Sequence, residues 1–227
     1  MGRDERKPKG TILLYEEIAA VPSSENGERM TDAVAYNATI VAAYEKADML
    51  PYTGTTLYVR DTVALKLARI NKTLTHQGFR LKIVYGYRHP EVQKNYFERQ
   101  RARLQELYPD LSPKTLDSLT HNLSSVPLVA GHPTGGAVDV TLVDMSGNVL
   151  EMGTRIADFS DPEKIKTFGK GVSPTELQNR LILHDAFLKD GFAPFYGEWW
   201  HFSYGDREWA CFYNKRSSLY SPLDFRK

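Results

Sequence analysis

The residue types best suited to chemistry gather in two short stretches of the 227-residue sequence. Residues 131–139 read GHPTGGAVD, and residues 198–201 read EWWH. Together they offer two imidazoles and two carboxylates. Two imidazoles and one carboxylate match the ligand set of a hydrolytic zinc site that keeps one position open for water. The candidate ligands are His132, Asp139 and His201.

A glycine pair makes the first two candidates compatible with one ion. On a continuous strand, two residues whose numbers differ by an odd number face opposite ways, and His132 and Asp139 differ by seven. Gly135 and Gly136 interrupt the strand pattern between His132 and Asp139 and allow His132 to fold back from a loop. We therefore expect a loop that carries His132, followed by a strand over residues 137–143 with Asp139 on the face opposite to its apolar side chains.

Glu198 provides the spare carboxylate. A carboxylate that lies beside a metal without binding it can take a proton from the bound water and hand it to a leaving amine. Glu198 and His201 are three positions apart, and on a regular strand such positions face opposite ways. The backbone must therefore bend at Trp199 or Trp200 for both side chains to reach one ion.

Arg88 is the fourth candidate. Residues 79–85 alternate between apolar and polar side chains, which predicts a strand, and Arg88 follows at its exit. A guanidinium is a permanent cation that can stabilise either an oxyanion or a substrate carboxylate. Other ionisable side chains of the following region are interpreted as solvated: Arg99, Arg101, Arg103 and His121.

The elements that must position these residues follow from periodicity. Apolar residues repeat at helical spacing from Asp61 to Gly78. Further helices are expected over about 90–107, 112–123 and 173–190, the last with a capping box at its start. Residues 153–172 read as a long loop, and loops of that length often act as lids. Residues 31–60 lack a clean period, residues 1–10 read as a disordered lead, and the tail from about Arg216 reads as loosely held.

Composition indicates a single-domain enzyme spanning residues 1–227, with no nucleic acid partner. The formal net charge is +1, and no apolar run is long enough to span a membrane. The single Cys211 excludes an internal disulfide and a thiolate-rich structural zinc site. The polar first ten residues show no signal peptide, so we expect a cytoplasmic protein, or a periplasmic one if a leader was removed. Oligomeric state is left open.

Several of these stretches together resemble one family, the VanX-type D-alanyl-D-alanine dipeptidases of the zinc D,D-peptidase and Hedgehog-like superfamily. Residues 131–139 are similar to that family's Ser-x-His-x-x-Gly-x-Ala-x-Asp signature, and residues 198–201 match its Glu-Trp-Trp-His motif. Further matches follow in the same order. Residues 87–90 resemble the family's Tyr-Arg-Pro segment, residues 152–155 followed by 158–159 resemble its Met-Gly-Ser/Thr-Arg-Phe-Asp-Phe segment, and the pairs 179–180 and 191–192 fall at matching places.

The resemblance implies an α+β domain with a central antiparallel sheet flanked by helices. It implies one Zn²⁺ bound by His132, Asp139 and His201, with Glu198 as catalytic base and acid and Arg88 stabilising the tetrahedral intermediate. The implied substrate, and the only partner expected, is a small dipeptide, D-Ala-D-Ala.

Two departures from the family pattern concern substrate recognition. Ala130 stands where the family has a serine that helps to hold the dipeptide. One residue more than the family pattern separates Arg155 from Asp158, the equivalent of the acidic residue that recognises the substrate amino group. The resemblance also suggests Tyr36 as a pocket-lining residue.

Two alternatives to a dipeptidase stay open at this point. A D,D-carboxypeptidase that trims muramyl peptides would need an open cleft, whereas the 153–172 loop favours a lid. A Hedgehog-like module that binds metal without catalysis would not need Glu198 and Arg88, and both are present.

Overall fold

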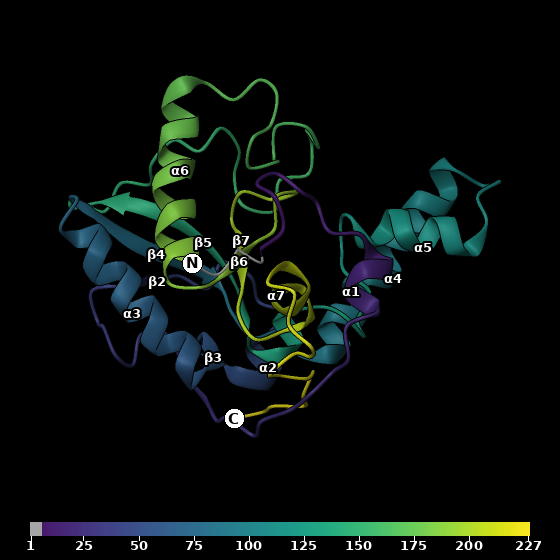
Figure 1. The fold of residues 1–227 in the computed structure, drawn as a ribbon, viewed down its shortest axis with the longest axis horizontal. Coiled ribbons are helices and arrows are strands. Elements are labelled where there is room, and N and C mark those ends of the chain that lie inside the picture. Colours follow the sequence, from purple (N-terminus) through teal and green to yellow (C-terminus); the bar gives the residue numbers. More distant parts are fainter. Residues whose placement is uncertain (1–5) are drawn as a thin grey trace.

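The computed structural model describes residues 6–227, and a five-stranded sheet with the order β2-β4-β5-β7-β6 forms its centre (Figure 1). Its strands are β2 (Val41–Ala42), β4 (Phe79–Tyr85), β5 (Ala137–Asp144), β6 (Ala193–Pro194) and β7 (His201–Ser203). Neighbouring strands are antiparallel except for β2 and β4, which are parallel. A separate antiparallel pair joins β1 (Met30–Asp32) to β3 (Tyr58–Arg60). The expected α+β fold with a central, mainly antiparallel sheet is confirmed.

Two long helices cover one face of this sheet: α3 (Asp61–Thr75) and α6 (Pro174–Lys189). The apolar stripe of α3 is buried against strands β4 and β5 in the main core. Ser173 and Glu176 form the predicted capping box at the start of α6. The Glu176 N–H donates to the Ser173 hydroxyl at 3.2 Å, and the Ser173 N–H donates to the Glu176 carboxylate at 2.8 Å. One sheet face is thereby closed, and the opposite face, which carries Asp139, is left for the pocket described below.

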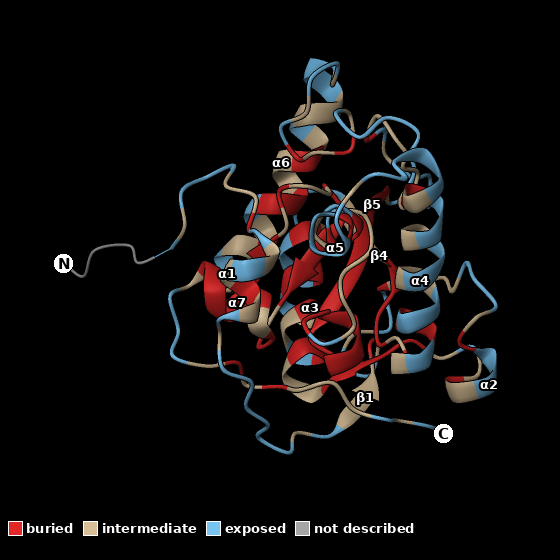
Figure 2. Cartoon of the chain, turned by 90° about the vertical axis from the view of Figure 1, so that its right-hand side faces the viewer, coloured by how far each residue is buried: buried red, intermediate tan, exposed pale blue. Residues whose placement is uncertain are grey.

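A helical hairpin of α4 (Pro90–Leu107) and α5 (Pro113–His121) projects from the sheet (Figure 1). The outer side of α4 is exposed (Figure 2). The bounds of α4 agree with the helix expected over about 90–107. The shorter helices are α1 (Tyr15–Ala19), α2 (Leu50–Thr53), the 3-10 turn η1 (His132–Thr134) and α7 (Arg207–Phe212). In the described part of the chain, no helix combines the length and apolar character that crossing a membrane requires.

The long segment between β5 and α6 contains no helix or strand, as expected, but the buried Arg180 holds it in place. Arg180 donates to the carbonyls of Met152 at 2.8 Å, Lys166 at 2.7 Å and Lys164 at 3.0 Å. Three carbonyls that are distant in sequence from this side chain are thereby fixed to α6.

The expectation of a loosely held tail is wrong. The Leu223 N–H donates to the carbonyl of Pro133 at 3.1 Å, and the Tyr87 hydroxyl donates to the carbonyl of Leu223 at 2.7 Å. The Phe225 ring packs edge-on against Tyr87, with centroids 5.7 Å apart. These contacts hold the C-terminal segment across the loop that carries His132.

The expected disordered lead falls partly on residues 1–5, which lie outside the described residues. For the remainder of that lead the structure differs. The Lys7 N–H donates to the carbonyl of Phe212 at 2.9 Å, and the Lys7 ammonium pairs with Glu17 at 2.9 Å. These two contacts attach the N-terminal segment to α7 and α1.

Candidate metal centre and its pocket

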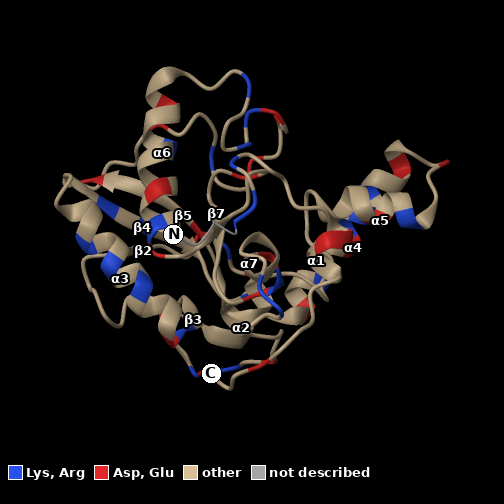
Figure 3. Cartoon of the chain, viewed as in Figure 1, with Lys and Arg blue, Asp and Glu red and all other residues tan. Residues whose placement is uncertain are grey.

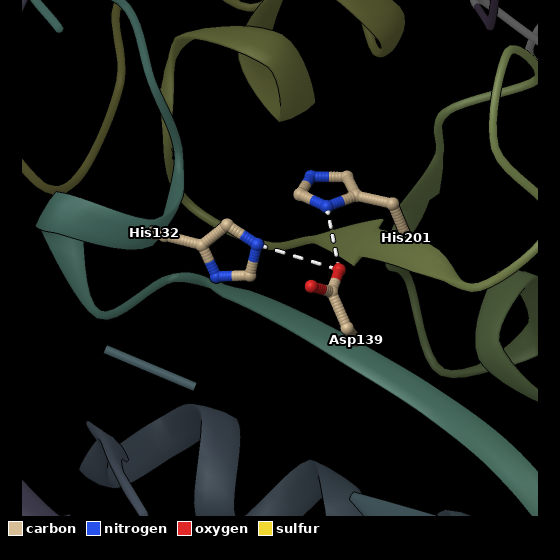
Figure 4. Close-up of side chains that lie close together, drawn as sticks. All are labelled: His132, Asp139 and His201. Atoms are coloured by element: carbon tan, nitrogen blue, oxygen red, sulfur yellow. Dashed lines mark hydrogen bonds and ion pairs between the residues drawn. The ribbon is translucent and has the colours of Figure 1, made fainter. Parts of the chain in front are cut away.

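Sheet register brings two of the candidate ligands together. Asp139 on β5 is paired with His201 on β7, so their side chains share one face of the sheet. His201 Nδ1 lies 3.0 Å from Asp139 Oδ1, and His132 Nε2 lies 3.3 Å from the same oxygen (Figure 4). One ligand atom from each of the three residues lies within 4.8 Å of the other two. Two imidazole nitrogens and a carboxylate oxygen at this spacing fit a zinc ion.

His132 reaches the cluster from η1 because Gly135 turns the chain. Gly135 has a φ of +73°, in the left-handed region that glycine adopts without cost, and its N–H donates to the His132 carbonyl at 3.1 Å. The His132 Nδ1 lies 2.8 Å from the carbonyl of Gly86, to which it donates as Nδ1–H. That hydrogen bond leaves Nε2 with a free lone pair directed at the cluster.

Glu208 on α7 lies on the other side of His201 and was not found from the sequence. Its Oε2 lies 3.9 Å from His201 Nε2, the ring nitrogen that points away from Asp139. Glu208 is only 7 % exposed, and its Oε1 has no hydrogen-bond partner. Ligating histidines in metal sites commonly direct their second nitrogen at a carboxylate, which orients the ring. No local pattern could indicate this, because the contact depends on how α7 packs.

The bend required between Glu198 and His201 is present. Residues 198–200 form a turn in which the His201 N–H approaches the Glu198 carbonyl at 3.3 Å, and β7 begins only at His201. Glu198 lines the same pocket as the cluster but is not among its three members. Burial raises the pKa of the Glu198 carboxyl to about 7, Asp139 adds to this rise, and His201 and Arg88 oppose it.

The three cluster residues respond differently to the same burial. Burial lowers the pKa of His132 to about 4. Burial acts in the same direction on His201, but Asp139 and Glu208 outweigh it and raise the pKa of His201 to about 9. Burial opposes the charge of Asp139, yet the two histidines hold its pKa well below the ordinary range. Asp139 is therefore an ionised acceptor at the centre of the cluster.

Arg88 stands at the exit of β4, as expected, and lines the pocket. Its N–H donates to the carbonyl of His132 at 3.2 Å, which connects the strand exit to the metal-binding loop. Its guanidinium donates to Gln93 at 2.8 Å and lies 4.3 Å from the centroid of the Tyr85 ring. The pocket that Arg88 lines has a volume of about 400 Å³.

Two expected substrate-binding residues lie elsewhere. Asp158 lines a second hollow together with Lys82 and Thr154, and its carboxylate accepts from the N–H of Ser160 at 3.1 Å. Its neighbour Ala157 has a φ of +58° and itself lines the main pocket, whereas Asp158 is not among the residues of that pocket.

Tyr36 is 42 % exposed and is absent from the residues that line the main pocket. Its hydroxyl donates to Asp61, at the start of α3, at 2.8 Å. Within the described residues, the structure therefore brings neither Asp158 nor Tyr36 to the metal cluster.

Several pocket residues were missed or misjudged. His121 is 5 % exposed and lines the pocket, so its interpretation as a surface residue is wrong. Arg99 and Arg103 are exposed, as expected, but they also line the pocket from α4, whereas Arg101 does not. Lys46 comes from the segment after β2, where the sequence showed no period.

Comparison with known proteins agrees with this geometry. A family model described as D-ala-D-ala dipeptidase matches residues 32–221. A D-alanyl-D-alanine dipeptidase of Escherichia coli is 29% identical over 170 residues, covering 75% of this chain and 74% of that protein. One from Synechocystis sp. is 30% identical over 124 residues, covering 47% of this chain and 50% of that protein, so the chain spans about half the length of that relative.

Solved structures give weaker matches. The vancomycin-resistance D,D-pentapeptidase VanY in complex with Zn(II) has 16% identity and a TM-score of 0.42, covering 72% of this chain and 82% of that one. The LD-carboxypeptidase LdcB has 16% identity and a TM-score of 0.46, and the match covers 92% of this chain and 88% of that one. The family match over residues 32–221 spans most of the sequence, and the chain belongs to the D-ala-D-ala dipeptidase family of peptidases.

Proposed function

We propose that the protein is a zinc-dependent dipeptidase that hydrolyses D-Ala-D-Ala or a closely related dipeptide. The observation that carries this proposal is the arrangement of one pocket. A cluster of two imidazoles and a carboxylate lies at its base, and Glu198 and Arg88 line the same space. The two dipeptidase relatives support the substrate class.

The chain's own residues suit peptide hydrolysis. Zinc held by His132, Asp139 and His201 would acidify a water molecule and polarise the scissile carbonyl. Glu198 then accepts a proton as the water oxygen bonds to the carbonyl carbon, and it returns this proton to the nitrogen as the C–N bond breaks. Arg88 stabilises the negative charge that develops on the carbonyl oxygen.

The charges of the pocket suit a zwitterion. We infer that the substrate ammonium is attracted by Glu198 and Glu208, which both line this pocket, a role that the resemblance had suggested for Asp158. Arg88 and the further cations Lys46, Arg99 and Arg103 line the same pocket. A dipeptide would therefore bind with its ammonium toward the two carboxylates and its own carboxylate toward the cations beside Arg88.

A three-substrate panel tests the proposal. The zinc-loaded protein is incubated with D-Ala-D-Ala, L-Ala-L-Ala and a muramyl pentapeptide, and released amino acid is measured. Hydrolysis of D-Ala-D-Ala alone is expected. Cleavage of the pentapeptide but not the dipeptide would instead favour a D,D-carboxypeptidase, and no hydrolysis of any would favour a catalytically silent metal-binding module.

Two variants separate metal binding from catalysis. Glu198→Ala is expected to retain zinc and lose activity, because Glu198 moves protons without binding the metal. His201→Ala is expected to lose zinc, because one of three protein ligands is removed. Zinc content by atomic absorption and hydrolysis rate are measured on both, and an active Glu198→Ala protein would refute its assigned role.

A further inference from the structure

One wall of the pocket is cationic. Its positively charged side chains are Lys46, Arg88, Arg99 and Arg103. Lys46 and Arg88 both lie over the rings of Tyr85 and Tyr96, with the Lys46 ammonium 5.4 and 5.0 Å and the Arg88 guanidinium 4.3 and 5.0 Å from the two centroids. The Arg99 guanidinium lies 5.8 Å from the Tyr96 centroid. Like charges therefore converge on two aromatic rings at this wall.

These cations lack the acidic partners that their neighbours on the same helix have. Arg101, which faces away from the pocket, pairs with Asp117 at 2.6 Å, and Lys94 lies 3.6 Å from Glu98. Within residues 6–227, by contrast, Lys46, Arg99 and Arg103 form no ion pair with a carboxylate.

The two acids nearest to Lys46 in sequence already have partners. Glu45 pairs with the ammonium of Lys82 at 2.7 Å. Asp48 accepts hydrogen bonds from the hydroxyls of Tyr44, Tyr85 and Tyr96. Elsewhere on the molecule, side chains of both signs are interspersed (Figure 3). The gathering of cations without direct ion pairs is thus a local feature of the pocket and does not reflect a basic protein.

The number of these cations exceeds what dialanine needs. A zwitterionic dialanine brings one carboxylate. With Arg88 assigned to the carbonyl oxygen, that carboxylate can neutralise one of Lys46, Arg99 and Arg103, and the other two would find no anionic partner on the substrate. A pocket of about 400 Å³ also lies in the size range that accommodates ligands larger than dialanine. Ala130, a small apolar side chain, lines this pocket as well.

We propose that the pocket selects dipeptides whose C-terminal residue carries a carboxylate side chain, held by Lys46, Arg99 and Arg103. This inference rests on the proposed dipeptidase function and narrows its substrate class. The ammonium end of the substrate faces Glu198 and Glu208, so the C-terminal residue, which becomes the released amino acid, extends toward the cationic wall. There its side-chain carboxylate supplies the second negative charge.

The test compares substrates that differ only in this charge. The zinc-loaded protein is assayed with D-Ala-D-Glu, its neutral amide counterpart D-Ala-D-Gln, and D-Ala-D-Ala. Each partly exposed ion pair contributes a factor of about 1.4 to 5. Three cations together therefore predict a kcat/KM about tenfold higher for D-Ala-D-Glu than for D-Ala-D-Gln, and a preference that shrinks at high salt.

Matched variants assign the effect to the wall. The double variant Arg99→Gln/Arg103→Gln, and separately Lys46→Met, is expected to reduce the ratio of D-Ala-D-Glu to D-Ala-D-Gln kcat/KM. Arg101→Gln, on the same helix but outside the pocket, is expected to leave the ratio unchanged. A ratio near one in the native protein, or an equal loss in the Arg101 variant, would overturn the inference.

The inference and the proposed function can fail separately. Hydrolysis of D-Ala-D-Ala without a preference for D-Ala-D-Glu would sink the inference and leave the dipeptidase standing. If no dipeptide is hydrolysed, calorimetric binding of D-Ala-D-Glu and D-Ala-D-Gln to the zinc-loaded protein still decides whether the wall selects the second carboxylate. Equal affinities would then refute it.

Discussion

Replacing Arg180 by methionine is expected to destabilise the protein by about 3–5 kcal/mol. Arg180 is 1 % exposed and supplies donors to the carbonyls of Met152, Lys164 and Lys166. Hydrogen bonds to a charged group contribute about 1.5–3 kcal/mol each, so three carbonyls would suggest a larger loss. Burial of this charge is itself costly, since it lowers the pKa of Arg180 to about 10. The methionine variant no longer bears that cost, which offsets part of the loss. The balance is a large but survivable loss for a domain of ordinary stability.

Urea unfolding followed by tryptophan fluorescence measures this loss, since Trp199 and Trp200 lie in the same core. Limited trypsin digestion adds a local readout, because the freed segment contains Lys164 and Lys166. Arg101→Met is the matched control, as its exposed pair with Asp117 contributes about 1 kcal/mol or less. A loss below about 1 kcal/mol for Arg180→Met, with unchanged trypsin sensitivity, would refute the view that this side chain holds the loop.

Three further predictions follow from the pocket. Glu208→Gln removes the carboxylate that faces His201 and is expected to weaken zinc binding about tenfold or more. Competition with a chelator measures the zinc affinity. A change below about twofold would exclude a role of Glu208 in orienting His201. Gly135→Ala is expected to cost about 1–2 kcal/mol in urea unfolding because its φ is +73°, and an unchanged midpoint would contradict this. Burial lowers the pKa of His121 from 6.5 to about 4, so the unfolded chain takes up the proton first as pH falls. Stability should therefore drop between these pKa values, by about 2 kcal/mol at about pH 5. The free energy of unfolding, measured by urea titration at several pH values, should fall more steeply with decreasing pH for the native protein than for His121→Gln. Parallel curves would refute the lowered pKa of His121.

Long periodic segments were predictable because burial of one face of a helix or strand imposes a regular spacing of apolar residues. The stripe of α3 and the alternation of β4 each bury one set of side chains, and the structure keeps both nearly within the expected bounds. The strands β1, β2 and β3 were not found, since two or three residues are too few to show a period.

The metal cluster and the bend before His201 could be inferred because local chemistry constrains them. The position of Asp158 could not, because Ala157 adopts a left-handed conformation that a non-glycine residue rarely shows and that the sequence does not signal. Lys46 and Glu208 were missed for another reason. Each enters the pocket through packing between elements far apart in the sequence, and nothing in their immediate neighbours records it.

The place of β7 between β5 and β6 has a consequence for synthesis in the cell. His201 follows Asp139 by 62 residues, so a ribosome finishes β5 well before its neighbouring strand exists. Until β7 arrives, the backbone of Ala137, Val138 and Asp139 lacks its partner on that edge of β5 and can pair with a misplaced strand. The proposed metal site is likewise completed late, because its third candidate ligand, His201, lies on β7.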